Sequence, residues 1–257
     1  MNVAVILRSR EMLNILTPFL DGHNVMHYTS KEDFLKDIKT GGQNHPSFLS
    51  ENLVLIVNAG ISIGEDVLSY ENIKLVQQFG IGYENIDLGY ASKKSILVFN
   101  APTNGTYNAV SVAELSLFFI IALARDYNGC VNSISHGIAN QPMGHSISEK
   151  KFAIIGLGGI GQEIIKMLKP FKPEIYGLKH SKPQDGYAEK LGIKFTGTVD
   201  GDFKKILPSV DYIILAVPLE KNTENLIDGE AVGLMKSGAY VINVGRAGLI
   251  NKDSLIK

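Results

Sequence analysis

The residues best suited to bind a cofactor form a glycine-rich segment with the sequence Gly-Leu-Gly-Gly-Ile-Gly. An apolar run of strand length, Phe152 to Ile155, precedes it, and a helical pattern, Gln162 to Leu168, follows it. In such a unit the glycines permit a tight turn, close approach of a pyrophosphate and close helix packing, while the helix N-terminus attracts phosphate. We therefore predict a dinucleotide site, the alternative being a purely structural turn. Its residues are Gly156, Gly158, Gly159, Ile160 and Gly161.

A basic segment follows the next apolar strand, Glu174 to Leu178. An NAD-binding fold usually places an acidic residue here for the ribose hydroxyls. This chain has Lys179, His180 and Ser181 instead, followed by Lys182. The cations and the hydroxyl suit a 2′-phosphate, so we expect NADP to be favoured over NAD. The alternative is a solvated turn, with the cofactor preference set elsewhere.

An arginine, Arg246, follows another apolar strand, which spans about Val241 to Val244. A guanidinium is always charged and can bind a carboxylate and a carbonyl oxygen together. Taken alone, an arginine in this position is more often a surface residue. The chain has six histidines, and none of them follows Arg246; we expect His136 and His145 to be exposed to solvent.

The composition narrows the class of protein. The 257 residues carry a net charge of −1, which gives no electrostatic reason to expect a nucleic acid or an anionic membrane as partner. The single cysteine, Cys130, favours a reducing, cytoplasmic setting. The N-terminus has the pattern of a strand and not of a signal peptide. No metal site is predicted.

Apolar strand patterns alternate with helical patterns, which indicates an α/β protein with parallel sheets. The most apolar stretch, Ala109 to Ala124, is shorter than a membrane span needs, and we expect a helix buried on all sides, in a core or a subunit interface. We expect 128–151 to be irregular and the two lobes to divide near 100–102. The predicted strands are Val3–Leu7, Leu53–Val57, Ile73–Val76, Ile96–Phe99, Phe152–Ile155, Glu174–Leu178, Tyr212–Val217 and Tyr240–Val244.

Five motifs, in order, resemble those of the D-2-hydroxyacid dehydrogenases. The match covers nearly the whole chain and is clearest from about Leu53 onward. The motifs are Gln78 to Asp87, Asn100-Ala101-Pro102 with Ser111 to Glu114, Gly156 to Gln162, Val217-Pro218-Leu219 with Thr223 to Asp228, and Ile242 to Arg246.

The resemblance implies two Rossmann-like lobes: a flavodoxin-like substrate lobe (residues 1–100, without its C-terminal return) and a doubly wound dinucleotide-binding lobe (101–257). It implies hydride transfer between NAD(P)H and a small 2-oxo or 2-hydroxy acid bound in the cleft between the lobes. It also implies a homodimer through the helix from Tyr107 to Arg125. Arg246 matches the catalytic arginine, Ile81, Gly82 and Asn108 match substrate-binding positions, and Val217, Pro218 and Thr223 are expected to line the cofactor.

Several features depart from the family or leave alternatives open. Asn108 could instead cap its helix. The usual Ala-Arg-Gly around the arginine is Gly245-Arg246-Ala247, which would strain Ala247 if that position needs a positive φ. The family's acid/base His and Glu lie downstream of the arginine, and we expect the chain to be part of a longer protein.

Two other functions remain open. The first is a catalytically inactive dinucleotide-binding sensor or interaction module on the same scaffold. The second is another two-lobe Rossmann enzyme, such as a relative of adenosylhomocysteine hydrolase. That family's Lys and Asp arrangement is not recognisable here, which makes it the weaker alternative.

Overall fold

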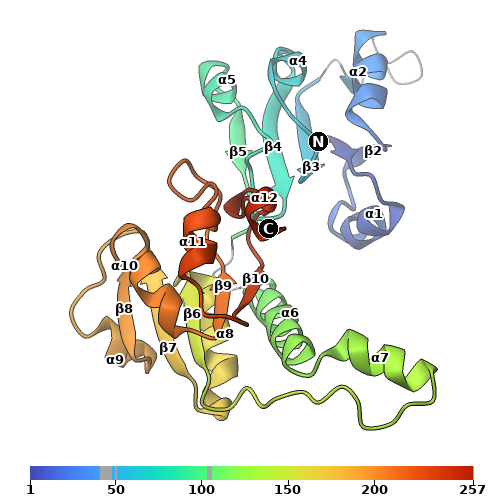
Figure 1. The fold of residues 1–257 in the computed structure, drawn as a ribbon. Coiled ribbons are helices and arrows are strands. Elements are labelled where there is room, and N and C mark those ends of the chain that lie inside the picture. The colour runs from blue at the N-terminus through green and yellow to red at the C-terminus, as the bar shows by residue number, and fades with distance from the viewer. Residues whose placement is uncertain (41–47, 50, 103–105, 257) are drawn as a thin grey trace. The chain divides into compact units, whose positions relative to one another are not determined.

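The computed structural model describes residues 1–40, 48, 49, 51–102 and 106–256. The chain forms two compact units, Met1–Pro102 and Thr103–Lys257. Each unit is built on a five-stranded sheet with helices around it (Figure 1). The predicted α/β class with two Rossmann-like lobes is confirmed. The assignment of 1–100 to the substrate and 101–257 to the cofactor stays a prediction.

The sheet of the first unit has the strand order β2-β1-β3-β4-β5, and all its neighbouring strands are parallel. This is the order of flavodoxin-like folds. The strands are β1 (Asn2–Ile6), β2 (Asn24–Tyr28), β3 (Leu53–Asn58), β4 (Ile73–Phe79) and β5 (Leu97–Phe99). The helices are α1 (Arg10–Leu16), η1 (Thr17–Phe19), α2 (Lys31–Lys39), α4 (Glu65–Leu68) and α5 (Leu88–Lys93).

Helices cover both faces of this sheet, which explains why its central strands are continuously apolar. Ala4 and Ile6 of β1 belong to a core that also contains residues of α2, α4 and α5. Val3 and Val5 point the other way, into a smaller core completed by residues of α1.

The sheet of the second unit has the strand order β10-β9-β6-β7-β8, again all parallel. Counted from β6 this is the Rossmann order, with the direction of winding reversed between β6 and β9. The strands are β6 (Lys151–Ile155), β7 (Glu174–Lys179), β8 (Phe195–Thr198), β9 (Tyr212–Leu215) and β10 (Tyr240–Asn243). The helices are α6 (Tyr107–Ala124), α7 (Tyr127–Ser135), α8 (Gly159–Leu168), η2 (Lys169–Phe171), α9 (Tyr187–Leu191), α10 (Val199–Ile206), η3 (Leu207–Ser209), α11 (Gly229–Leu234), η4 (Ala247–Leu249) and α12 (Lys252–Leu255).

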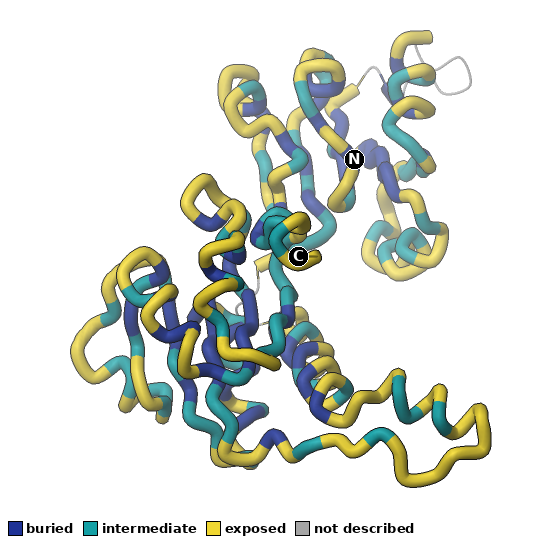
Figure 2. The backbone as a smooth tube through the Cα atoms, in the orientation of Figure 1, coloured by how far each residue is buried: buried dark blue, intermediate teal, exposed yellow. Residues whose placement is uncertain are grey.

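The second sheet is covered in the same way. Phe152 and Ile154 of β6 belong to a core shared with α6 and α8, whereas Ala153 and Ile155 belong to one shared with α10 and α11. Figure 2 shows buried residues concentrated in the strands and mostly exposed residues along α7.

Within the single chain, the long helix α6 is buried on one face only. The sequence predicted burial on all sides, in a core or a subunit interface, and the interface alternative stays a prediction. Its buried residues are mainly small, including Ala113 and Ser116, and they let the helix approach its neighbours closely. Phe118 is 52% exposed and Leu115 is 48% exposed. By length and composition alone, this helix could cross a membrane. This is weak evidence for a membrane span, because α6 packs on α8.

Other differences from the sequence prediction involve weakly patterned segments. The strands β2 and β8 were not predicted, and both lie at the edge of a sheet. The segment expected to be irregular contains the helix α7, which Asp126 caps by accepting a hydrogen bond from the Gly129 N–H.

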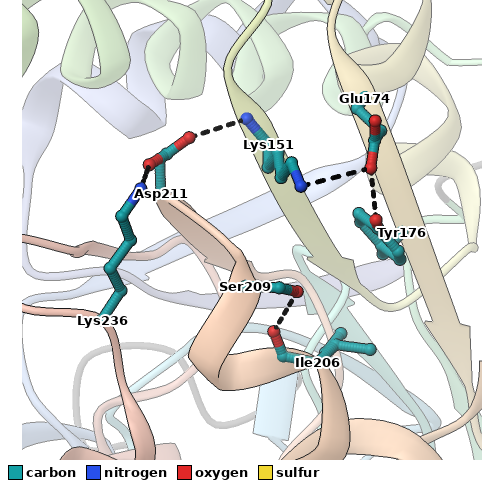
Figure 3. A network of polar contacts seen from close by, with 7 residues as sticks. All are labelled: Lys151, Glu174, Tyr176, Ile206, Ser209, Asp211 and Lys236. Carbon is teal, nitrogen blue, oxygen red and sulfur yellow. Dashed lines mark hydrogen bonds and ion pairs between the residues drawn. The ribbon is translucent and has the colours of Figure 1, made fainter.

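A polar network joins the amino ends of three strands of the second unit (Figure 3). The Asp211 carboxylate accepts a hydrogen bond from the Lys151 N–H at 3.0 Å and pairs with Lys236 Nζ at 2.5 Å. Lys151 Nζ lies 3.7 Å from the carboxylate of Glu174, which also accepts from the Tyr176 hydroxyl. Burial opposes ionisation of Asp211, but its hydrogen bond from Lys151 and its pairing with Lys236 hold its pKa below the ordinary value.

Candidate active site

The glycine-rich turn connects β6 to α8 at the carboxyl edge of the second sheet. Gly156 has a φ of +107°, and a Cβ there would lie 2.4 Å from the main-chain oxygen of Ala216. A Cβ on Gly161 would lie 1.8 Å from the main-chain oxygen of Gly156. Each position therefore requires glycine, one for the turn and one for the close contact between helix and turn.

Gly158 differs from the other two glycines. It is the N-cap of α8, and a Cβ built on it would meet no atom within 4 Å. The space in front of it is open, and the N–H groups of the first turn, from Gly159 to Gly161, have no partner within the helix. These residues fit a pyrophosphate. Gln162 braces the turn by donating from Nε2 to the Leu157 oxygen at 2.9 Å.

The basic segment after β7 has partners that the sequence did not reveal. Lys179 Nζ lies 5.2 Å from the centre of the Tyr187 ring, a cation–π arrangement. Asn222 Nδ2 lies 2.9 Å from His180 Nδ1, which joins this segment to the loop after β9. Ser181 is exposed. No sequence motif marks Asn222, because its contact with His180 joins two loops that are distant in the sequence.

The loop after β9 holds its shape through Thr223. The Thr223 hydroxyl donates to the Pro218 oxygen at 2.8 Å and accepts from the Glu220 N–H at 2.8 Å. Thr223 is only 5% exposed, so it can influence a cofactor chiefly through the shape of the loop. Val217 is also buried, and its Cγ1 lies 3.1 Å from the Cβ position of Gly156.

Arg246 follows β10, at the same edge of the sheet as the glycine turn, with β9 between β10 and β6. It is the N-cap of η4, and its Nη1 donates to the Gly245 oxygen at 3.3 Å. Ala247 is not among the residues with positive φ, so the strain considered from the sequence is absent. The residue of this turn that must be glycine is instead Gly245, because a Cβ there would lie 2.7 Å from the main-chain oxygen of Val217.

In the first unit, the predicted carboxylate-binding residues follow β4. The Gly80 oxygen accepts from the Ala101 N–H at 2.8 Å, and the Ile81 oxygen accepts from Asn100 Nδ2 at 2.6 Å. Within the described part of the chain, the N–H groups of Ile81 and Gly82 donate no hydrogen bond.

Asn108 lies in the second unit, in the first turn of α6, and it is exposed. The N-cap of this helix is Thr106, so the alternative that Asn108 caps it is wrong.

One histidine differs from its predicted exposure. His145 is half-buried, with Nε2 2.9 Å from the Tyr212 hydroxyl and its ring stacked on Tyr240. Both tyrosines begin strands, so His145 lies at the edge of the sheet opposite Arg246. His136 is exposed, as predicted, and His45 lies outside the described residues.

Comparisons with known proteins match this arrangement. The NAD binding domain model of the D-isomer specific 2-hydroxyacid dehydrogenases matches residues 117–257, and the catalytic domain model of the same family matches 42–150. A D-3-phosphoglycerate dehydrogenase of Methanocaldococcus jannaschii is 33% identical over 88% of the chain and 40% of its own length. A hydroxypyruvate reductase of Thermotoga maritima is 30% identical over 79% of the chain and 63% of its own length.

Solved structures share the fold. A D-lactate dehydrogenase from Aquifex aeolicus, complexed with NAD and lactic acid, gives a TM-score of 0.79 at 24% identity and covers 99% of this chain and 72% of its own. The present chain thus spans 40% and 63% of the two curated relatives above. The matched models support a nicotinamide dinucleotide as the cofactor class. The chain belongs to the D-isomer specific 2-hydroxyacid dehydrogenase family.

Proposed function

We propose that this protein transfers a hydride between a nicotinamide dinucleotide and C2 of a small 2-oxo or 2-hydroxy acid. The observation that carries the proposal is the position of Arg246 and the open turn at Gly158 at one edge of one sheet. In open α/β sheets, ligands bind beyond the carboxyl ends of the strands, where the winding reverses. A phosphate-binding turn and a cation for an organic acid therefore occur together where that fold binds ligands.

The residues of the chain have separate tasks in this proposal. The N–H groups from Gly159 to Gly161 bind the pyrophosphate, and Gly158 leaves room for it. The bound nicotinamide supplies or accepts the hydride. Arg246 binds the substrate carboxylate and polarises the carbonyl oxygen, a geometry that a planar guanidinium favours. Ile81, Gly82 and Asn108 are also proposed as substrate-binding residues, the first two through their main-chain N–H groups and Asn108 through its exposed side chain. We assign no residue to the proton transfer.

We also propose that NADP is preferred over NAD. Support comes from Lys179, His180 and Ser181, which lie at the end of β7, where an NAD-binding fold usually carries an acidic residue. The hydrogen bond between Asn222 and His180 fixes the imidazole beside this segment. A 2′-phosphate would find two cationic or protonatable side chains and a hydroxyl there.

A homodimer through α6 is the third part of the proposal. The exposed face of α6 is apolar, and a groove of about 860 Å³ beside it is lined by Phe118, Phe119, Leu123, Met143 and Tyr240, among others. A contiguous exposed apolar face beside such a groove favours an interface. A cytoplasmic location remains part of the proposal, on the basis of the single thiol, Cys130.

The test is oxidation of NADPH by the intact gene product, monitored as loss of nicotinamide absorbance, with glyoxylate and hydroxypyruvate as substrates. We expect turnover by the wild type and loss of turnover in Arg246→Ala, with NADPH affinity unchanged. NADPH binding without turnover of any 2-oxo acid would contradict catalysis and favour a dinucleotide-binding sensor.

A further inference from the structure

The side chain of Asn243 makes two hydrogen bonds that enclose the turn before Arg246. Its Oδ1 accepts from the Gly245 N–H at 3.0 Å, and its Nδ2 donates to the Arg246 oxygen at 2.8 Å. Both partners are main-chain groups, so the orientation of the amide follows from their chemistry.

Other contacts fix the same turn. The Val244 N–H donates to the Leu215 oxygen at 3.1 Å, and the Leu249 N–H donates to the Arg246 oxygen at 3.1 Å. Leu249 is fully buried. The backbone of Arg246 is therefore held by β9, by η4 and by the amide of Asn243, and only the last is a side chain that can be replaced.

We propose that Asn243 is a positioning residue that sets the direction in which Arg246 presents its guanidinium to the substrate carboxylate. This inference rests on the proposed function of Arg246. A bidentate contact between a guanidinium and a carboxylate depends on alignment. A misplacement of about 1 Å can cost about 100-fold in rate, so geometry at this level has a measurable effect.

An amide is the side chain that suits this place. A carboxylate of the same shape would keep the acceptor for the Gly245 N–H but would place negative charge against the Arg246 oxygen. A methyl group would remove both hydrogen bonds and leave two main-chain groups to find other partners. Asn243→Asp therefore tests the donor bond alone, and Asn243→Ala tests both bonds together.

The experiment is calorimetric titration of the full chain, saturated with NADPH, with oxamate, an unreactive isostere of a 2-oxo acid. We expect Asn243→Ala and Asn243→Asp to bind oxamate about tenfold more weakly than the wild type. NADPH affinity should stay unchanged, because within the described residues no hydrogen bond joins Asn243 to the glycine turn after β6. If Asn243→Ala fails to fold, Asn243→Asp still tests the donor bond.

Asn251→Ala is the matched control. Asn251 also closes a local turn, by accepting from the Ser254 N–H at 3.2 Å, but it makes no hydrogen bond with Arg246. We expect this variant to bind oxamate as the wild type does.

The outcomes separate the two proposals. If the wild type binds NADPH but not oxamate, the proposed role of Arg246 fails. If the wild type binds oxamate, Arg246→Ala does not, and both Asn243 variants bind like the wild type, the role of Asn243 is refuted while the proposed function stands.

Discussion

A Cβ atom on Gly161 would lie 1.8 Å from the main-chain oxygen of Gly156, so α8 and the turn before it fit together only with glycine at this position. Gly161→Ala must push the helix away from the sheet, and we expect a loss of about 3 kcal/mol in the free energy of unfolding. Urea denaturation measures it.

The matched control for this substitution is Gly233→Ala. Gly233 lies in α11, and a Cβ there meets no atom within 4 Å. We expect its free energy of unfolding to equal or exceed that of the wild type. Equal stability of Gly161→Ala and the wild type would show that α8 does not contact the Gly156 oxygen as closely as described.

Replacing Lys179, the last residue of β7, tests the cofactor preference. Lys179→Asp would set a carboxylate against the 2′-phosphate, and like charges in proximity repel. We expect NADPH affinity to fall about tenfold relative to NADH affinity. Lys74→Asp makes the same change in net charge in the first unit and should alter neither affinity. An unchanged ratio of the two affinities in Lys179→Asp would refute the NADP proposal.

The polar network of Figure 3 predicts a pH dependence of stability. The folded state holds the pKa of Asp211 below its ordinary value, so its ionised form stabilises the fold above about pH 4. This contribution is lost as the pH falls through the folded-state pKa. We expect Asp211→Asn to unfold about 1 kcal/mol more easily than the wild type at pH 7 and to lose this disadvantage towards pH 3. A difference independent of pH would contradict the assignment.

The exposed face of α6 predicts self-association. Phe118→Glu would place a charge in the proposed interface, and burying an unpaired charge is costly. By sedimentation velocity we expect the wild type at twice the chain mass of 28.0 kDa and Phe118→Glu at the mass of one chain. Phe19, exposed on η1, provides the control Phe19→Glu, which should remain a dimer. A monomeric wild type would refute the proposal.

The sequence predicted the strands that lie in the middle of each sheet, because burial on both faces leaves a continuous apolar run. The structure has β1, β3, β4, β6, β7 and β9 close to the predicted limits, and the edge strands β5 and β10 were predicted as well. The sequence prediction missed β2 and β8. Both lie at sheet edges and carry polar residues, such as Asn24 and Thr196, at exposed or partly exposed positions. β2 and β8 lack the continuous apolar run that the prediction used, whereas the edge strands β5 and β10 keep such a run in Leu97–Phe99 and Tyr240–Ile242.

The site was predictable to the extent that it depends on local sequence. The spacing of the glycines predicts the turn, and the structure gives a separate reason for glycine at each of the positions 156, 158 and 161. Contacts between distant loops, such as Asn222 with His180, could not be predicted, because they arise only when the strands are ordered in the sheet. The exposure of His145 was wrong for the same reason: its partner, Tyr212, is 67 residues away.

We propose that the open space before Gly158 receives the pyrophosphate of the cofactor. Gly158→Ala tests it directly, because the added methyl group meets no protein atom and should change the stability by no more than about 1 kcal/mol. We predict that calorimetry will find NADPH binding by the wild type and none by Gly158→Ala at the same protein concentration, with closely similar unfolding curves. NADPH binding of wild-type strength by a folded Gly158→Ala would show that the pyrophosphate does not bind in this space.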